Sequence, residues 1–263
     1  MNPTPSTDAA ALLPPPPSHV LPLGWFVTGT DTEIGKTLTS SALLHALSAA
    51  GVRCVGMKPI AAGTELRNNV LRNEDADRLA AAASVALSPA LATPYLLREA
   101  AAPHVAAALE HVHIDLAHVQ NCFVRSAARA DVIVVEGVGG FRVPLSDGYD
   151  TADMAHNLAL PVILVVGLRL GCLNHALLTA EAIAARGLTL AGWVCNVVDV
   201  NMGHAEASIA ALRQRLPAPL LGVVPRLKSA DAGAAAAFLD FSRLATWVAA
   251  TAVRAAGTAA PAD

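Results

Sequence analysis

Residues 25–37 read WFVTGTDTEIGKT, and this stretch decides how the rest of the chain is interpreted. A short run of β-prone residues, Trp25–Thr28, leads into a loop bracketed by two glycines, and a segment compatible with a helix follows from Lys36 to Ala50. Strand, loop and helix in this order are the context that a phosphate-binding loop requires, because free backbone N–H groups at a helix N-terminus point at the anion. The stretch therefore predicts a nucleotide site.

The loop differs from the usual phosphate-binding pattern by one residue. Five residues lie between Gly29 and Gly35, whereas four are usual. We interpret it as a variant loop, because Gly35, Lys36 and Thr37 keep the three functional parts: close backbone approach to phosphate, neutralisation of the β- and γ-oxygens, and a hydroxyl for Mg²⁺. The alternative is a surface turn before an amphipathic helix, and the flanking strand and helix favour the nucleotide site.

The composition limits the class of protein. A chain of 263 residues needs no second core, so we expect one domain over residues 23–255, a disordered Pro- and Ala-rich extension over 1–22 and a flexible tail over 256–263. The net charge of −3 does not indicate the excess of basic residues that binding to nucleic acid or to a membrane surface requires. The longest uncharged window, Leu79–Leu97, is interrupted by prolines, unlike a membrane-spanning helix. We expect a soluble, cytoplasmic protein whose partners are small molecules.

The cysteines and histidines form no recognisable framework. The cysteines are widely spaced without a CxxC pair, so we expect reduced, buried thiols at Cys54, Cys122, Cys172 and Cys195. Four histidines lie between residues 104 and 118, but no cysteine or carboxylate cluster completes a metal site there. We expect the surrounding region, 94–120, to form a partly exposed helix.

Strand and helix patterns alternate along the rest of the chain. The apolar runs at 132–135 and 161–167 are typical of strands buried on both faces of a parallel sheet. Further strands are expected at 53–60, 190–198 and 220–225, and further helices at 76–85, 174–186, 203–216 and 234–253. This alternation predicts an α/β fold, a doubly wound and mostly parallel sheet with helices on both faces.

Charged residues stand at the ends of several expected elements. Lys58 falls at the end of one strand, Glu136 ends another before a glycine-rich turn, and Asp75 lies near a helix start. Ligands bind at the carboxyl edge of an open parallel sheet, so we expect Lys58 and Glu136 beside Lys36, with Glu136 directed at Mg²⁺. For Asp75, a helix cap and a magnesium ligand both remain open. For Lys58, the alternative is a solvated surface charge.

The segment 168–175, LRLGCLNH, connects a buried strand to a helix that we expect to begin near Asn174. Free N–H groups at that start, with Arg169 nearby, suit a carboxylate. A structural turn explains the segment equally well.

Six motifs together resemble the dethiobiotin synthetase family: GTDTEIGKT at 29–37, MKP at 57–59, LRNED at 71–75, VEGVGG at 135–140, VVGLRLGCLNH at 165–175 and AGWVCN at 191–196. The resemblance runs from about Trp25 to about Leu227, and any single motif would also fit related amidotransferases or partitioning ATPases. It implies a P-loop NTPase-like ligase of biotin biosynthesis that uses ATP and Mg²⁺ to close a cyclic urea on 7,8-diaminononanoate with CO₂. The implied route passes through a carbamate and a carbamic-phosphoric anhydride and releases ADP and phosphate. The resemblance also implies a homodimer with substrate bound at the subunit interface.

Carried over residue by residue, the resemblance implies four groups of site residues. ATP would be bound by Glu33, Ile34, Gly35, Lys36, Thr37 and Leu38, and bordered by Gly137, Val138, Gly139, Asn196, Val197, Pro225, Arg226 and Leu227, with Asn196 reading adenine. Mg²⁺ would be surrounded by Thr37, Asp75 and Glu136. Lys58, Lys36 and Thr32 would act in catalysis. Substrate would meet Lys58, Ala62 and Gly139, and its carboxylate would meet Leu170, Gly171 and Asn174 of the partner subunit.

Two positions depart from the family pattern. Ala62 stands where a small hydroxyl residue is usual, so one side-chain hydrogen bond to substrate is absent. The family tends to place an acid that meets the ribose in the last loop, and here only Asp231 is available, out of register.

Other functional classes remain open. They are a partitioning or regulatory switch ATPase, a related ATP-dependent amidotransferase-type synthase, and an inactive relative that only binds nucleotide. Switch ATPases commonly carry a second lysine in the phosphate loop, and positions 30–34 hold none. The joint presence of Lys36, Thr37, Lys58, Asp75 and Glu136 argues against an inactive relative.

Overall fold

A six-stranded parallel sheet forms the centre of the computed structural model, which describes residues 23–257. In chain order the elements are β1 (Leu23–Gly29), α1 (Lys36–Ala49), β2 (Cys54–Met57), β3 (Ile60–Ala62), β4 (Glu65–Arg67), β5 (Val70–Arg72), α2 (Glu74–Ala82), α3 (Pro89–Ala92), β6 (Tyr95–Leu97), α4 (Pro103–Leu109), α5 (Leu116–Ala127), β7 (Val132–Glu136), α6 (Thr151–Leu158), β8 (Val162–Leu168), α7 (Cys172–Ala185), β9 (Leu190–Val197), α8 (Ala205–Arg215), β10 (Leu220–Val224), α9 (Ala232–Ala236), the 3₁₀ helix η1 (Phe241–Arg243) and α10 (Trp247–Gly257). The sheet has the order β10-β9-β8-β1-β7-β2, and all its hydrogen-bonded strand pairs are parallel. The predicted doubly wound α/β fold is confirmed.

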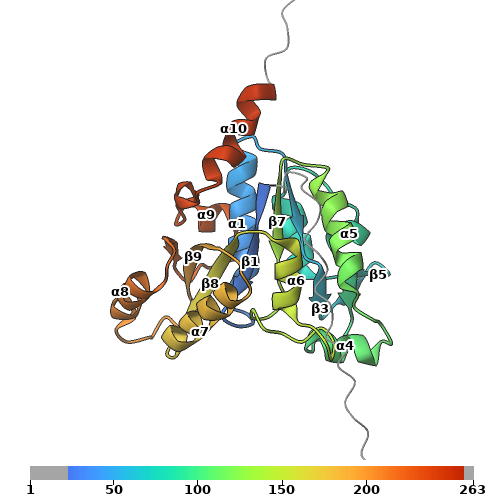
Figure 1. Cartoon of the computed structure of the whole chain (residues 1–263), viewed down its shortest axis with the longest axis horizontal. Coiled ribbons are helices and arrows are strands. Elements are labelled where there is room, and N and C mark those ends of the chain that lie inside the picture. Colours follow the sequence, from blue (N-terminus) through green and yellow to red (C-terminus); the bar gives the residue numbers. More distant parts are fainter. Residues whose placement is uncertain (1–22, 258–263) are drawn as a thin grey trace, which may run out of the picture.

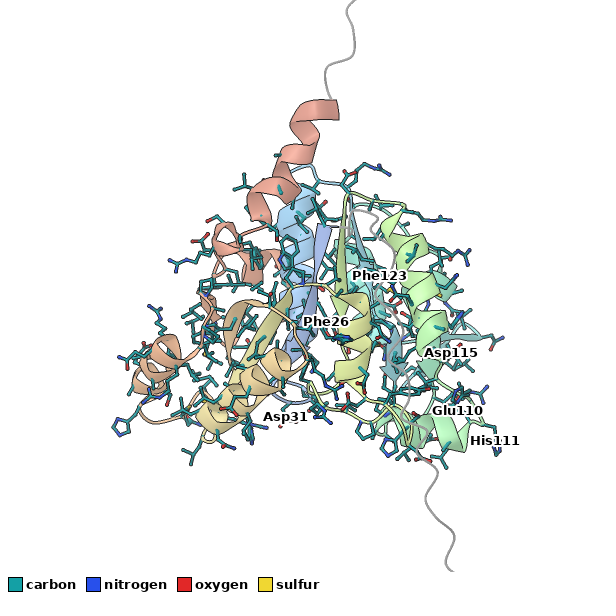
Figure 2. The ribbon with its side chains drawn as sticks, in the orientation of Figure 1. Phe26, Asp31, Glu110, His111, Asp115 and Phe123 are labelled. Carbon is teal, nitrogen blue, oxygen red and sulfur yellow. The ribbon has the colours of Figure 1, made fainter. Side chains whose placement is uncertain are left out.

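Helices cover both faces of this sheet (Figure 1). On one face Trp25 and Val27 of β1 belong to a core cluster with α1, α2, α9 and α10. On the other face Phe26 belongs to a cluster with α4, α5 and α6, and Figure 2 marks Phe26 on the sheet and Phe123 on α5. A third cluster packs α7 and α8 against β8 and β9. Because consecutive residues of a central strand face opposite helix layers, the strand carries an unbroken apolar run.

The strand order reverses around β1, and this reversal positions the site. From β1 the chain passes through α1 to β2 at one edge, then returns to β7 between them, whereas β8, β9 and β10 extend the sheet the other way. Ligands bind outside the carboxyl ends of the strands at such a switch point. The loop that follows Gly29, with residues 30–35, starts there.

Two stretches of the chain differ from the sequence-based expectation. The strand expected at 53–60 ends at Met57, and residues 60–62 form β3, which pairs with β6 in a separate two-stranded sheet. Pro59 separates the two strands, since proline has no N–H for the ladder. The helix expected over 94–120 is instead β6, α4 and α5, with Pro103 at the first turn of α4 and Asp115 capping α5.

Two further differences lie in polar or alanine-rich sequence. Residues 65–72 form the antiparallel hairpin β4–β5, with Asn68 and Asn69 at positive φ in its tip, and no strand was expected there. The closing helix expected over 234–253 is divided into α9, η1 and α10. Helix α10 reaches Gly257, two residues into the expected tail, while residues 1–22 and 258–263 lie outside the described part of the chain. Among residues 23–257, no helix is long and apolar enough to cross a membrane.

Candidate active site

The phosphate-binding loop joins the central strand to the first helix, as its sequence predicted. Gly35 caps α1 in the left-handed conformation, with φ of 94°. A Cβ at this position would lie 2.3 Å from Nδ2 of Asn196, so a side chain is excluded by sterics as well as by φ. Asn196 Nδ2 donates a hydrogen bond to the Ile34 carbonyl at 2.9 Å, which fixes the loop to the end of β9. The free N–H groups in the first turn of α1 are thereby held at the sheet's carboxyl edge.

Two side chains at the start of α1, Lys36 and Thr37, lie at the carboxyl edge of the sheet. The ammonium of Lys36, which is only 7% exposed, donates to the Asp31 carbonyl at 2.7 Å, and Figure 2 labels Asp31. Burial lowers the pKa of Lys36 to about 8, although the Glu136 carboxylate opposes that shift. The Thr37 hydroxyl donates to Oε1 of Glu136 at 2.8 Å. The helix start therefore presents a cation and a hydroxyl directly beside the carboxylate that ends β7.

Lys58, Asp75 and Glu136 converge beside this helix start. Lys58 Nζ lies 2.6 Å from Glu136 Oε1 and 3.0 Å from Asp75 Oδ2. Lys58 is 4% exposed and Glu136 is fully buried, so the surface-charge alternative for Lys58 is wrong. Asn73, not Asp75, caps α2 by accepting from the Ala76 N–H at 3.2 Å. Asp75 is therefore free to turn its carboxylate to the lysine.

The charges of this cluster support one another. Burial acts to lower the pKa of Lys58, but the carboxylates of Glu136 and Asp75 outweigh it, and the pKa lies above the usual value. Burial acts to raise the pKa of Asp75, but the Lys58 ammonium outweighs it, and the pKa lies below the usual value. Lys58 is therefore a permanent cation and Asp75 a permanent anion at neutral pH.

The oxygen donors here fit a magnesium ion. Oε2 of Glu136 is buried without a hydrogen-bond partner in the described structure, which marks an oxygen with unused acceptor capacity. Within residues 23–257 no group of three or more His, Cys, Asp or Glu side chains forms a metal cage. Two carboxylates and the Thr37 hydroxyl leave coordination positions for phosphate oxygens and water, which is the arrangement that Mg²⁺ prefers.

A cleft of about 1130 Å³ opens over these groups. Most of the residues predicted for nucleotide and substrate line it, namely Thr32, Glu33, Gly35, Lys36, Thr37, Leu38, Lys58, Ala62, Asp75, Val138, Gly139, Asn196, Val197, Pro225, Arg226 and Leu227. Ile34, Glu136 and Gly137 lie behind the lining, where Ile34 contributes the carbonyl bound by Asn196. Residues up to 195 positions apart in the chain, from Thr32 to Leu227, thus meet at one edge of the sheet.

Three predicted substrate residues do not reach this chain's own cleft. Leu170 is 91% exposed, Gly171 caps α7 at a φ of 92°, and Asn174 is exposed in the first turn of that helix. Helix α7 begins at Cys172, two residues before the expected start. The guanidinium of Arg169, which we expected near a bound carboxylate, forms an ion pair with Asp31 and so connects this segment to the phosphate-binding loop.

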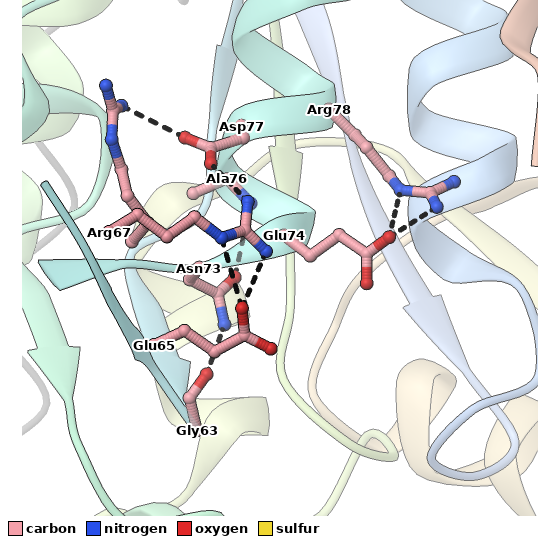
Figure 3. A network of polar contacts seen from close by, with 9 residues as sticks. Gly63, Glu65, Arg67, Asn73, Glu74, Ala76, Asp77 and Arg78 are labelled. Atoms are coloured by element: carbon pink, nitrogen blue, oxygen red, sulfur yellow. Dashed lines mark hydrogen bonds and ion pairs between the residues drawn. The ribbon is translucent and has the colours of Figure 1, made fainter.

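One wall of the cleft was missed by sequence reasoning. The hairpin β4–β5 and the first turns of α2 contribute Glu65, Arg67, Arg72, Glu74 and Arg78 to the lining (Figure 3). The only sequence signal was the density of charge in the run from Glu74 to Arg78, of which Asp75 alone was selected. Asp231 caps α9 by accepting from the Ala234 N–H at 2.6 Å and is not among the residues that line the cleft.

A parallel sheet, a phosphate-binding loop at its switch point and a buried lysine–carboxylate cluster define a nucleotide-binding protein of the P-loop NTPase type. The family described as an AAA domain matches residues 24–234. Over 226 residues the chain is 64% identical to the ATP-dependent dethiobiotin synthetase BioD of Janthinobacterium sp. (strain Marseille), which covers 84% of this chain and 96% of that protein. The chain belongs to the dethiobiotin synthetase family, and the predicted resemblance is confirmed.

A solved structure supports the fold independently. The MinC:MinD cell division protein complex of Aquifex aeolicus contains a chain that is similar with a TM-score of 0.51, at 14% identity, over 92% of this chain and 98% of that chain. At this identity the similarity supports the shared α/β fold alone.

Proposed function

We propose that this chain is an ATP-dependent dethiobiotin synthetase, a ligase that forms C–N bonds. It inserts CO₂ between the two amines of 7,8-diaminononanoate, closes the ureido ring of dethiobiotin and releases ADP and phosphate. The observation that carries this conclusion is the identity of 64% with a dethiobiotin synthetase across most of both chains. The lysine–carboxylate cluster beside Lys36 and Thr37 supplies the matching chemistry. Both favour the ligase over a switch ATPase or an amidotransferase-type synthase.

The reaction requires fixed positive charge more than a nucleophile. An amine adds CO₂ to give a carbamate, the carbamate oxygen attacks the γ-phosphoryl group, and the second amine displaces phosphate from the mixed anhydride. Two anions must therefore meet before the phosphoryl transfer. Lys36 and Lys58 are held at the same edge of the sheet by Asp31, Asp75 and Glu136, and such preorganised cations stabilise the charge of the transition state. A bound Mg²⁺ supplies further charge neutralisation at the phosphates.

The individual roles follow from position in the cleft. We assign ATP phosphates to the segment from Glu33 to Leu38, and Mg²⁺ to Thr37, Asp75 and Glu136. We assign Thr32 to catalysis with Lys36 and Lys58, because it lines the cleft close to Gly139, a residue assigned to the substrate. Asn196 and Val197 at the end of β9 face the base, together with the wall from Pro225 to Leu227, and Val138 lines the cleft beside the nucleotide with Gly137 behind it.

Ala62 contacts the substrate through its backbone in this proposal. Asn73 Nδ2 donates to the Gly63 carbonyl at 2.9 Å, and this bond holds the segment that carries Ala62 against the cleft. The missing hydroxyl therefore removes one hydrogen bond without removing the wall that the substrate meets.

The active form is proposed to be a cytoplasmic homodimer. Leu170, Gly171 and Asn174 are exposed on this chain and would enter the cleft of a second copy, where the start of α7 would bind the substrate carboxylate. Leu178 on the same helix is also a largely exposed apolar side chain. The cytoplasmic location is supported by four free, buried cysteines.

Phosphate release tests the proposed function directly. Release is measured with ATP, Mg²⁺ and bicarbonate, with and without 7,8-diaminononanoate, while dethiobiotin is measured by mass spectrometry. We expect phosphate and dethiobiotin to appear together and only with the diamine. Phosphate release that is indifferent to the diamine would favour a switch-type ATPase instead.

A further inference from the structure

The first turn of α2 carries three acids, and each forms ion pairs with its own basic partners. Figure 3 shows two of these acids, Asp77 and Glu74. Asp75 pairs with Lys58 in the reaction centre, and Asp77 pairs with Arg67 and Arg72 of the hairpin β4–β5. The third acid, Glu74, pairs with Arg78 one helical turn later. The reaction described above uses only the first of these pairs.

Arg78 connects α2 to a part of the chain that is distant in sequence. Its Nη1 donates to the Ala230 carbonyl at 2.9 Å, while Nε and Nη2 donate to Glu74 Oε1 at 3.2 and 2.5 Å. Glu74 thereby holds the guanidinium in an orientation from which it binds a carbonyl 152 residues away in the sequence. Both Arg78 and Ala230 line the cleft.

The loop that receives this bond borders the nucleotide. Residues 225–230 follow β10, and Asp231 after them caps α9, so the loop is anchored at both ends. Between these anchors, Arg78 is the one side chain from another element, among residues 23–252, that hydrogen-bonds to the loop. The same loop contributes Pro225, Arg226 and Leu227 to the cleft.

We infer that Arg78 is a positioning residue for the nucleotide: it holds the 225–230 loop against α2, so that the wall facing the base keeps a fixed separation from the phosphate-binding loop. A loop that is already ordered loses less conformational entropy when the base binds against it. The inference rests on the proposed function in one respect, since it takes this loop to be the base side of an ATP site. It adds to that function a determinant of ATP affinity that does not contact the reacting atoms.

The test separates base-dependent from phosphate-dependent binding. Arg78→Gln removes the charge and the planar fork of donors, and Arg78→Lys keeps the charge on a single nitrogen without the fork. Arg215→Gln is the matched control, because Arg215 ends α8 and its Nη1 donates only within that helix, to Ala211 at 3.1 Å. For each variant, the Kd of ATP and the Kd of inorganic tripolyphosphate are measured by calorimetry with Mg²⁺, and kcat is measured at saturating ATP.

We expect Arg78→Gln to raise the Kd of ATP about fivefold, the scale for losing one hydrogen bond of this kind at a partly exposed site. The Kd of tripolyphosphate and kcat should stay within about twofold of wild type. Arg78→Lys should recover part of the ATP affinity, and Arg215→Gln should change nothing. A thermal melt of each variant confirms that the fold is intact.

Two results would overturn the inference. Equal weakening of ATP and tripolyphosphate would mean that the guanidinium contacts phosphate directly. Unchanged ATP affinity in Arg78→Gln would mean that the bond to Ala230 is a surface contact without a role in binding. Neither result depends on the diamine, so failure of the inference is distinct from failure of the ligase assignment, which the formation of dethiobiotin by the wild-type protein decides.

Discussion

Replacement of Lys58 by Met tests whether the buried cation serves the fold, the reaction or both. The change removes an ammonium that lies 2.6 Å from one carboxylate and 3.0 Å from another while keeping a side chain of similar length. Glu136 is fully buried, so its carboxylate would lose its counter-charge inside the protein. Removing one partner of a buried ion pair costs about 3–5 kcal/mol. Because the Thr37 hydroxyl still donates to Glu136, we expect the lower end, about 3 kcal/mol.

Activity and stability should separate when the second partner is neutralised as well. In Lys58→Met with Glu136→Gln the buried carboxylate is neutralised together with its partner, so we expect the free energy of unfolding to recover most of the loss of the single variant. Turnover should not return. Loss of one preorganised cation slows the chemical step by about 10²–10³-fold, and both the single and the double variant should show at least this loss.

The two quantities are measured separately. Urea unfolding with EDTA and without nucleotide gives stability, so that no added cation can replace the lysine. Formation of dethiobiotin at saturating substrates gives kcat. Near-normal turnover in Lys58→Met would refute the catalytic role of this lysine. A double variant no more stable than the single one would refute the charge-pair reasoning, because the cost would then come from lost packing.

Three further outcomes follow from other parts of the chain. Gly35→Ala should weaken ATP binding at least about tenfold, since φ is 94° and Asn196 occupies the place of a Cβ; Gly148→Ala, which has nothing within 4 Å, is the control in the same calorimetric titration. The pKa of Asp150 lies below its usual value because Arg142 and the N–H groups it caps outweigh burial, so Asp150→Asn, which keeps a capping oxygen but loses the ion pair with Arg142, should cost about 1–2 kcal/mol at neutral pH. This difference begins to fall near pH 3.8 and is lost only below the lowered pKa of the folded protein, where wild type and variant should give the same urea midpoint; a gap that persists there would contradict the reasoning. Burial raises the pKa of Cys195 to about 12, so a disulfide reagent at pH 8 should label this thiol only after unfolding; rapid labelling of the folded protein would show that the thiol is accessible.

The positions of Lys58 and Glu136 were predictable from sequence for a geometric reason. In a parallel sheet all strands end at the same edge, so a charge that follows an apolar run is placed without knowledge of the strand order. The order itself, with β7 inserted between β1 and β2, was not needed for that inference. Asp75 needed more, because a helix cap and a magnesium ligand were both open, and only the structure shows that Asn73 takes the cap by accepting from the Ala76 N–H.

Other features were not predictable because tertiary contacts override local preference. The alanine-rich stretch after residue 232 favours one helix, yet Asp240 caps a separate 3₁₀ turn. The ring of Phe241 stacks on that of Trp247, and the ring centroids of Trp247 and Trp25 in the sheet are 6.4 Å apart. Burial of these aromatic rings, rather than helix propensity, therefore decides the path of the chain. The bond from Arg78 to Ala230 joins an exposed helix face to a loop, and no periodic pattern reports such a contact.

The two lysines at the sheet edge differ in a way that assigns them different tasks. Lys58 is compensated by two carboxylates, and its pKa is raised. Lys36 donates only to a backbone carbonyl, and burial lowers its pKa to about 8 even with Glu136 nearby. A buried cation without a direct carboxylate partner gains most when an anion arrives, because the anion offsets its desolvation.

The formal charges of Lys36, Lys58, Asp75 and Glu136 sum to zero. A triphosphate that binds beside a neutral cluster brings its own charge with little net compensation from these four groups. A divalent cation carried in with the nucleotide offsets part of that charge, and the oxygens of Thr37, Asp75 and Glu136 lie where they can accept it. The dependence on magnesium thus follows from the neutrality of this cluster, because the charges of its two lysines are already compensated by its two carboxylates.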